Sequence, residues 1–274
     1  MYLDNIVSIG AYIIRQKKIP NLFKPRTLTD KILYLKLRPQ HAQSNIRRLV
    51  SDRVKSRDYV SRLSKNCQLI NLLWSGKSFK VDDWESLPRK FVIKANHGSK
   101  MVMIIDKHKD SYSDVSSIVH SWLDLDYYKK GKEWVYKDLD RLLVVEEFIE
   151  FDGGVPPDYK FFCLNGKVHF IQVDLDRYNG HSRNIYSKNF ELLDVKYNFD
   201  RGYDIEPPNL LNEAIKIAED LSSELDFIRV DLYILENKIY FGELTNFPGN
   251  CLEKFTPNQF DLDMGNLLVL KNEK

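Results

Sequence analysis

The sequence predicts an α+β protein in which a mostly helical N-terminal region precedes two blocks of strands and helices. Apolar residues recur at helical spacing through much of residues 1–88, whereas short apolar or alternating runs typical of strands begin at residue 89. The run GGVPP at residues 153–157 marks a second boundary or hinge. We therefore expect three parts, at residues 1–88, 89–149 and 150–274.

The N-terminal region is expected to hold three helices. Apolar residues between Leu3 and Ile14 fall at helical spacing, and the basic residues that follow them suit the C-terminal end of a helix. Thr29 is a candidate cap for a second helix, which ends before Pro39. A third helix is expected over residues 51–63.

The two later blocks are expected to be built around hairpins. Strands at residues 91–95 and 101–106 flank a short loop, and a helix follows at residues 113–123. The dipeptide Asn165-Gly166 joins two further strands and is the strongest hairpin signal in the chain. A strand is also expected at residues 141–149, and helices at residues 211–224 and 262–270.

Composition is that of a soluble globular protein, with 274 residues, 43% hydrophobic and 29% charged. The three cysteines lie far apart, so the sequence indicates neither a zinc site nor a disulfide framework and suits a reducing cytoplasm. No signal peptide is recognised, because the first bases follow the apolar run instead of preceding it. That run is also far shorter than a membrane-spanning helix requires.

Charge is distributed unevenly along the chain. Residues 1–65 contain fifteen Lys and Arg against four Asp and Glu, a net charge of +11, whereas the remaining 209 residues contain 26 and 35, a net charge of −9. A basic segment of this kind often meets an anion, such as a membrane surface, a nucleic acid or an acidic glycan. The alternative is a solvated helical surface that pairs in part with the acidic remainder.

The stretch from Phe227 to Asn250 is a candidate metal-binding hairpin. If its loop has three residues centred on Asn237, antiparallel pairing sets Asp231 opposite Glu243 and Arg229 opposite Thr245, all on one face. Two facing carboxylates repel unless a cation lies between them. Oxygen ligands beside an arginine suit Mg²⁺ held together with phosphate. The alternative is an ordinary surface hairpin with solvated charges.

Lys94 is a candidate phosphate ligand. It ends a strand directly before the loop Asn96–Lys100, and backbone N–H groups of such a loop can cradle phosphate oxygens. The loop is not a Walker P-loop, because strands flank it on both sides. An exposed hairpin tip is the structural alternative.

Other polar residues follow or belong to strands. Glu146 and Glu147 end a buried strand that can offer its backbone to an adenine edge, although a solvated sheet edge would look the same. Asp158 and Lys160 share a strand face, where a carboxylate can hold ribose and a lysine can reach phosphate; a plain cross-strand charge pattern is the alternative. Arg177 lies in a basic cluster that could grip an anionic substrate.

Taken in order, these segments resemble the ATP-grasp enzymes, specifically the branch named for teichuronopeptide biosynthesis (TupA-like), over nearly the whole chain. The ATP-grasp fold consists of two α+β subdomains that clasp ATP. The matching segments are PRTLTDKILYLKL at 25–37, VIKANHGS at 92–99, EWVY at 133–136, VVEEFI at 144–149, DYKFF at 158–162 with NGK at 165–167, RVD at 229–231 and ELT at 243–245.

The resemblance implies a role for each candidate residue. Lys94 and Lys160 would contact ATP phosphates, and the loop with His97, Gly98 and Ser99 would fold over them. The adenine would be bordered by Glu146, Glu147, Phe148 and Ile149, and the ribose by Asp158. Asp231 and Glu243, with Thr245 as a third candidate, would hold Mg²⁺. Arg229 and Arg177 would face the carboxyl group being activated, and Lys160, at the phosphates, would be catalytic with them.

Two positions depart from the family pattern. Many family loops read Gly-Ser-Gly, whereas Lys100 stands at the second glycine. Many ATP-grasp enzymes have Glu-x-Asn at the metals, whereas this chain has Thr245 followed by Asn246. Because neighbouring residues of a strand point to opposite faces, Asn246 replaces the missing ligand only if the strand bulges.

The resemblance implies an ATP- and Mg²⁺-dependent ligase that amidates a uronic-acid sugar with an amino acid or amine in bacterial surface-polysaccharide biosynthesis. The sugar would be an anionic glycan or a nucleotide- or lipid-linked precursor, and the basic N-terminal region could touch a membrane. The alternative enzyme class is a glycosyl- or phosphoryl-transferase that acts on a polysaccharide precursor. Nucleic-acid binding is the third hypothesis, and no recognition motif supports it.

Overall fold

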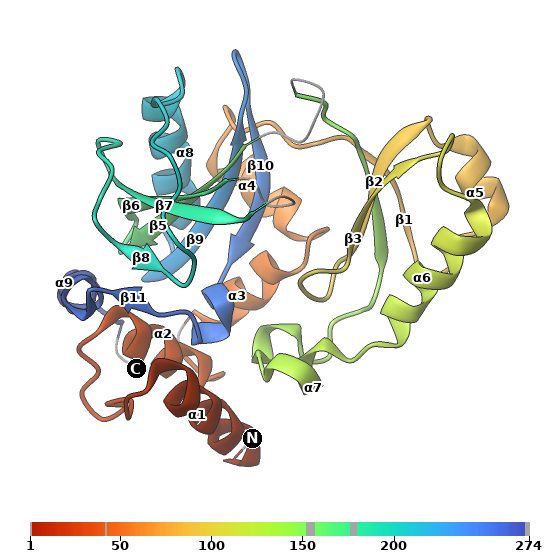
Figure 1. Cartoon of the computed structure of the whole chain (residues 1–274). Helices are drawn as coiled ribbons and strands as arrows, with labels where there is room; N and C mark the ends of the chain where they lie inside the picture. Colours follow the sequence, from red (N-terminus) through yellow and green to blue (C-terminus); the bar gives the residue numbers. More distant parts are fainter. Residues whose placement is uncertain (1, 42, 152–156, 176–179, 272–274) are drawn as a thin grey trace.

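The computed structural model describes residues 2–41, 43–151, 157–175 and 180–271 (Figure 1). The helices are α1 (Tyr2–Gln16), α2 (Leu28–Lys36), α3 (Ser44–Ser51), α4 (Ser56–Leu63), α5 (Val81–Ser86), α6 (Tyr112–Asp124), α7 (Tyr127–Gly131), α8 (Leu211–Ser222) and α9 (Asn258–Leu267), with 3-10 turns η1 (Trp134–Tyr136) and η2 (Pro248–Cys251). The strands are β1 (Leu72–Gly76), β2 (Lys90–Ala95), β3 (Val102–Asp106), β4 (Leu143–Glu147), β5 (Asp158–Leu164), β6 (Lys167–Leu175), β7 (Ser182–Ser187), β8 (Lys196–Tyr197), β9 (Phe227–Ile234), β10 (Ile239–Thr245) and β11 (Phe255–Thr256).

Two antiparallel sheets form separate lobes, which confirms the predicted α+β class (Figure 1). The smaller lobe has the strand order β1-β4-β2-β3, and the larger has β10-β9-β5-β6-β7. The predicted turn at Asn165-Gly166 joins β5 to β6. Residues 153–156, which carry most of the expected hinge, lie outside the described part of the chain.

The smaller lobe is held together by one apolar face of its sheet. Buried and less buried residues alternate along β2, and the buried ones, Phe91 and Ile93, pack in one cluster with Val115 and Val119 of α6. Trp84 of α5 belongs to the same cluster. Strand β1 completes the sheet by pairing with β4, so residues 72–86 belong to this lobe, although the sequence suggests an N-terminal region extending to residue 88.

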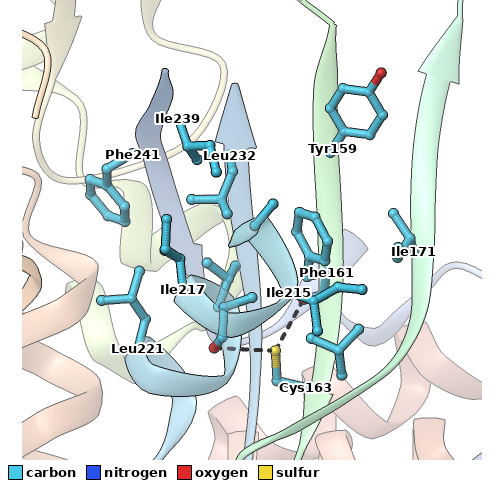
Figure 2. Packing of buried hydrophobic residues seen from close by; sticks show 14 of the residues in the cluster. Tyr159, Phe161, Cys163, Ile171, Ile215, Ile217, Leu221, Leu232, Ile239 and Phe241 are labelled. Atoms are coloured by element: carbon cyan, nitrogen blue, oxygen red, sulfur yellow. Dashed lines mark hydrogen bonds between the residues drawn. The ribbon is translucent and has the colours of Figure 1, made fainter. Parts of the chain in front are cut away.

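In the larger lobe, α8 covers one face of the sheet, as Figure 2 shows. Ile217 and Leu221 of α8 pack in a cluster with Leu232 of β9 and Phe241 of β10. The alternation predicted for β9 is therefore observed, since its apolar residues face α8 and its charged residues point to the opposite face. The opposite face carries polar side chains such as Lys160 and Asp231 toward one end, and toward the other end Phe162 and Phe227, which belong to a second apolar cluster with residues of α2.

The hairpin β9–β10 has the predicted register at its charged end, where Asp231 pairs with Glu243 and Arg229 with Thr245. Its turn is shorter than expected, because the backbone N–H of Leu235 donates to the carbonyl of Lys238 at 2.9 Å. A bulge at Gly242 restores the register. A Cβ atom there would lie 2.8 Å from the carbonyl oxygen of Asp231, so only glycine fits without a backbone shift.

The N-terminal region packs against the end of the larger lobe. Helix α2 begins at Leu28 and is capped by Thr27, whose side chain accepts from the N–H of Asp30; the predicted cap, Thr29, instead donates to Asp261 of α9 at 2.6 Å. The guanidinium of Arg47 on α3 is fully buried and forms an ion pair with Asp226, just before β9. Part of the positive charge of residues 1–65 therefore pairs with acidic residues later in the chain. This agrees with the second interpretation of the uneven charge, that of a helical surface partly paired with the acidic remainder.

We expect Gly242→Ala to destabilise the protein by about 2 kcal/mol, because the added methyl group meets a backbone oxygen that cannot turn away. Urea unfolding measures the change. The matched control is Gly10→Ala in α1, where no atom lies within 4 Å of the added carbon and a small gain in stability is expected. An unchanged unfolding midpoint for Gly242→Ala would show that the bulge is not sterically required.

Candidate functional site

Lys94 and Glu146 form the polar part of the smaller lobe. Lys94 on β2 pairs with Val144 of β4, two residues before Glu146, so both side chains leave the sheet on the same face. The Nζ of Lys94 donates to Oε2 of Glu146 at 2.6 Å. Glu146 is 8% exposed, and a buried carboxylate of this kind is stable only when it is paired. The predicted phosphate lysine is thus held by one of the residues predicted near the adenine.

Asp231 lies at the centre of the polar face of the larger lobe. Its two carboxylate oxygens accept from Nε and Nη2 of Arg229, both at 2.7 Å, in a bidentate ion pair. The Nζ of Lys160 lies 3.2 Å from the same carboxylate and also bonds Asp158. Burial lowers the pKa of Arg229, but the carboxylates of Asp231 and Glu243 outweigh it and raise that pKa overall.

Glu243 extends this network toward the smaller lobe. Its carboxylate lies 3.4 Å from Nη2 of Arg229 and accepts from Oγ1 of Thr245 at 3.0 Å. Burial raises the pKa of Glu243, but the positive charges of Arg53, Arg229 and Lys160 dominate and lower it to about 2. The carboxylate is therefore ionised at neutral pH, and a cation that binds it would compete with Arg53 and Arg229.

Two arginines of the N-terminal region reach the site, and sequence reasoning did not assign them. Arg53 donates through Nη1 to the carbonyl oxygens of Ala95 and Gly98, at 2.5 and 2.6 Å, while its Nη2 lies 3.5 Å from Glu243. Arg57 contacts Oε1 of Glu146 at 3.2 Å. The only available signal was the basic excess of residues 1–65, which does not single out individual arginines.

One cleft brings together part of this network. It is lined by Arg53 and Arg57, by Lys94 and Glu146 of the smaller lobe, and by Glu243 of the larger lobe. Within and beside it, five cationic side chains already pair with four carboxylates. Any anionic ligand that enters must therefore exchange existing ion pairs for its own.

The donor set suits Mg²⁺ held with phosphate more than a metal held by protein alone. Among the described residues no group of three or more His, Cys, Asp or Glu could hold a metal. Asp231 and Glu243 do face each other, and Mg²⁺ commonly takes one or two carboxylates and completes its shell with phosphate oxygens and water. The guanidinium of Arg229 now bridges these two carboxylates.

Thr245 and Asn246 point in opposite directions. The hydroxyl of Thr245 lies at the network, accepting from Nη2 of Arg229 at 3.1 Å. Asn246 is buried on the other side, where its Nδ2 donates to the carbonyl of Arg47 at 3.0 Å and to Oγ of Ser51 at 2.9 Å. Asn246 therefore does not take the place of the missing asparagine, and Thr245 is the residue that reaches the carboxylates.

The loop after β2 is braced at several points. His97 is buried, and its Nε2 lies 3.0 Å from the carbonyl oxygen of Trp122. Gly98 is enclosed by Tyr127 and Met101, since a Cβ atom there would lie 2.6 Å from both side chains. Ser99 is exposed, and Lys100 adopts a left-handed φ of 65°. The backbone therefore keeps the conformation that glycine favours, although a lysine occupies the position.

Among the remaining residues predicted for the site, those around the end of β4 are not part of the ion-pair network around Asp231. Glu147 is exposed and accepts from Nδ2 of Asn71 at 2.7 Å, so its side chain is engaged outside the cleft. Phe148 and Ile149 follow the end of β4 and are half-buried. Arg177 lies outside the described residues.

Glu133 is a buried carboxylate that the sequence analysis left without a role. It is 7% exposed, and no described residue donates a hydrogen bond to its side chain. Burial raises its pKa to about 7, although the charge of Lys36 opposes the shift. Glu133 thus exchanges a proton near neutral pH, beside the network that contains Glu243.

This raised pKa predicts a pH-dependent stability that Glu133→Gln removes. Because the folded state binds the proton more tightly, the free energy of unfolding falls as pH rises from the ordinary value of 4.5 to about 7. The loss reaches about 3 kcal/mol above that range. Urea unfolding at about pH 5 and about pH 8 should show a smaller pH dependence for Glu133→Gln than for the wild type.

The matched control is Glu236→Gln, a change at an exposed residue of the β9–β10 turn. This variant should keep the pH dependence of the wild type. If Glu133→Gln also keeps it, the Glu133 carboxyl does not titrate in the range given.

The chain matches the model of the TupA-like ATP-grasp family over residues 30–269. Similar solved structures include D-alanine–D-alanine ligase from Bacillus anthracis complexed with ATP, with 15% identity over 72% of this chain and 54% of that one and a TM-score of 0.44. The corresponding ligase from Helicobacter pylori has 17% identity over 80% and 59%, with a TM-score of 0.46. An ADP complex of N5-carboxyaminoimidazole ribonucleotide synthetase has 12% identity over 72% and 45%, with a TM-score of 0.46.

The chain spans less than two thirds of the length of each of these structures. The comparison with curated proteins gave no match. The family model, in contrast, extends from α2 to beyond α9 and includes every segment that contributes to the cleft. With most of its residues matched by that model, this protein belongs to the TupA-like ATP-grasp family.

Proposed function

We propose that this protein is an ATP- and Mg²⁺-dependent carboxylate–amine ligase that joins an amino acid or another amine to a uronic-acid sugar in bacterial surface-polysaccharide assembly. The observation that carries the proposal is the shared cleft, in which Lys94 from one lobe and Glu243 from the other line the same space. Membership of an ATP-grasp family supports the use of ATP.

The nucleotide would lie between the lobes with its phosphates toward the two lysines. Lys94 and Lys160 now neutralise carboxylates, and each can turn to a phosphate oxygen without leaving its strand. Glu146 and the residues up to Ile149 would border the adenine, and Asp158 the ribose. The loop with Gly98 and Ser99 would cover the phosphates and exclude water from the reacting group.

Asp231 and Glu243, with the hydroxyl of Thr245 nearby, are the residues that would hold Mg²⁺. When bound, the ion neutralises charge on the transferring phosphoryl group. The chain's own contribution is to hold both carboxylates facing each other across β9 and β10 and to lower the pKa of Glu243 to about 2.

The proposed reaction has two steps. An oxygen of the uronic-acid carboxylate attacks the γ-phosphorus of ATP, the bond to ADP breaks, and an acyl phosphate forms. The amine nitrogen then attacks the acyl carbon, phosphate leaves, and the nitrogen loses a proton as the amide forms. Arg229, with Arg177 as a second candidate, would stabilise the negative charge of the acyl phosphate.

The acceptor is proposed to be anionic, as a polymer or as a nucleotide- or lipid-linked precursor. Arg53 and Arg57 support this choice, because two guanidinium groups stand at the cleft beyond the two lysines assigned to phosphate. Arginine binds carboxylates through paired N–H donors, which suits a uronic acid.

The direct test is ADP release from ATP and Mg²⁺ in the presence of paired uronic acids and amines. We expect ADP release that requires both substrates, with the amide detected by mass spectrometry. ATP binding without ADP release for any pair would contradict ligation. Tighter binding of a nucleotide sugar than of ATP would favour the alternative, a glycosyl- or phosphoryl-transferase.

We expect Glu243→Gln to reduce kcat/KM for ATP by about 100-fold or more, because one of the two facing carboxylates loses its charge. The matched control is Glu236→Gln in the same hairpin, which should retain full activity. Thermal unfolding of both variants checks that they fold. Equal activity of Glu243→Gln and the control would remove Glu243 from the proposed Mg²⁺ site.

A further inference from the structure

Helix α1 lies on the surface with its polar side toward the protein and its apolar side toward solvent, which is the opposite of the usual arrangement for a globular protein. The side that faces the rest of the protein is polar or tyrosine, with Ser8, Tyr12 and Gln16 at 4%, 0% and 3% exposure. The opposite side forms an apolar stripe that spans about a third of the helix circumference. Its members are Leu3 (75% exposed), Ile6 (51%), Val7 (54%), Ile13 (37%) and Ile14 (75%).

Hydrogen bonds fix the helix in this orientation. The hydroxyl of Tyr12 donates to Oδ1 of Asp30 at 2.6 Å. The Nε2 of Gln16 donates to the carbonyl oxygen of Glu253 at 2.6 Å. Rotating α1 to bury its apolar stripe would break these hydrogen bonds. The free energy lost with them opposes the free energy gained by burying the stripe. The stripe therefore stays on the outside.

Two further exposed apolar residues follow the helix in the chain. Ile19 is 83% exposed and Phe23 is fully exposed, in the segment that leads from α1 to α2. Single exposed apolar residues are ordinary on protein surfaces, whereas a continuous patch is typical of a site that binds a membrane or another protein.

Basic residues lie at the C-terminal end of α1 and in the segment that follows it. Arg15, Lys17 and Lys24 are exposed, and no described carboxylate pairs with any of them. In contrast, Arg57 and Arg62, later in the same basic region, form ion pairs with Glu146 and Glu224. Part of the positive charge of the basic region that forms no ion pair therefore lies in the same stretch of chain as the exposed apolar stripe.

We propose that α1 and the segment up to Lys24, here called the docking surface, bind an anionic lipid bilayer. Leu3, Ile14 and Phe23 enter the boundary between headgroups and acyl chains, and the flanking bases contact lipid phosphates. No helix among the described residues is long and apolar enough to span a membrane, and α1, with 15 residues, lies along the interface. The docking surface does not depend on the proposed ligase activity.

The docking surface is connected to the cleft through α7, which lies beside α1 in Figure 1. Asp4 of α1 accepts from the hydroxyl of Tyr128 at 2.9 Å and lies 2.9 Å from Nζ of Lys132. The neighbouring Tyr127 encloses Gly98 of the loop after β2. Membrane binding would therefore hold this end of the cleft near the lipid surface.

Co-sedimentation of the full chain with lipid vesicles tests the proposal. We expect binding to vesicles of phosphatidylcholine with phosphatidylglycerol, and much weaker binding to phosphatidylcholine alone. The variant Leu3→Ser with Ile14→Ser should bind about 100-fold more weakly, because two side chains that bury in the bilayer are lost. Arg15→Gln with Lys17→Gln should weaken binding about fivefold for each base removed and make it less salt-dependent.

The matched control replaces two apolar residues that are as exposed but lie elsewhere, Tyr203→Ser with Val269→Ser, at 62% and 68% exposure. This variant should bind as the wild type does, and circular dichroism should show that all variants fold.

Three results would overturn the proposal: no binding of the wild type to anionic vesicles, equal binding of the Leu3 and Ile14 variant, or a dimer in solution that this variant abolishes while vesicles bind neither protein. The last result would make the stripe an interface between two copies of the chain.

Discussion

The cleft depends on the neutralisation of buried charge around Asp231. A carboxylate that is 2% exposed is stable in the fold only because Arg229 binds both of its oxygens and Lys160 adds a second positive charge. Removing one partner would leave an uncompensated charge, which usually costs several kcal/mol. Glu243 and Arg53 extend the same network toward the smaller lobe. The arrangement of the two lobes is therefore tied to charge balance as well as to apolar packing.

Much of this site could be predicted from the sequence, because hairpins are local and their pairing follows from alternation. The sequence correctly predicted that Asp231 pairs with Glu243, but the prediction assumed a three-residue loop, and the observed turn is shorter. The shorter turn alone would have set Asp231 opposite Gly242, and the bulge at that glycine moves Glu243 into place. A glycine inside a strand pattern is a known sign of a bulge, so this detail was within reach of the sequence.

What the sequence could not provide were contacts between distant segments. Arg53 and Arg57 meet the lobes across 42 to 190 positions of the chain, and no periodic pattern records such contacts. The pairing of β1 with β4 was missed for the same reason, because the local sequence of a short strand does not show which distant strand it pairs with. The opposite directions of Thr245 and Asn246, by contrast, follow from strand geometry.

Arg53 contacts both lobes through the two amino groups of its guanidinium. One amino group of its guanidinium holds the carbonyls of Ala95 and Gly98, and the other lies near Glu243. A cation bound by Glu243 would weaken only the contact between Arg53 and Glu243. An anion that binds the whole guanidinium would break that contact and also the hydrogen bonds to Ala95 and Gly98. Ligands of opposite charge would therefore act on the loop in different ways, and an anion bound by Arg53 would release the loop that is proposed to cover the phosphates.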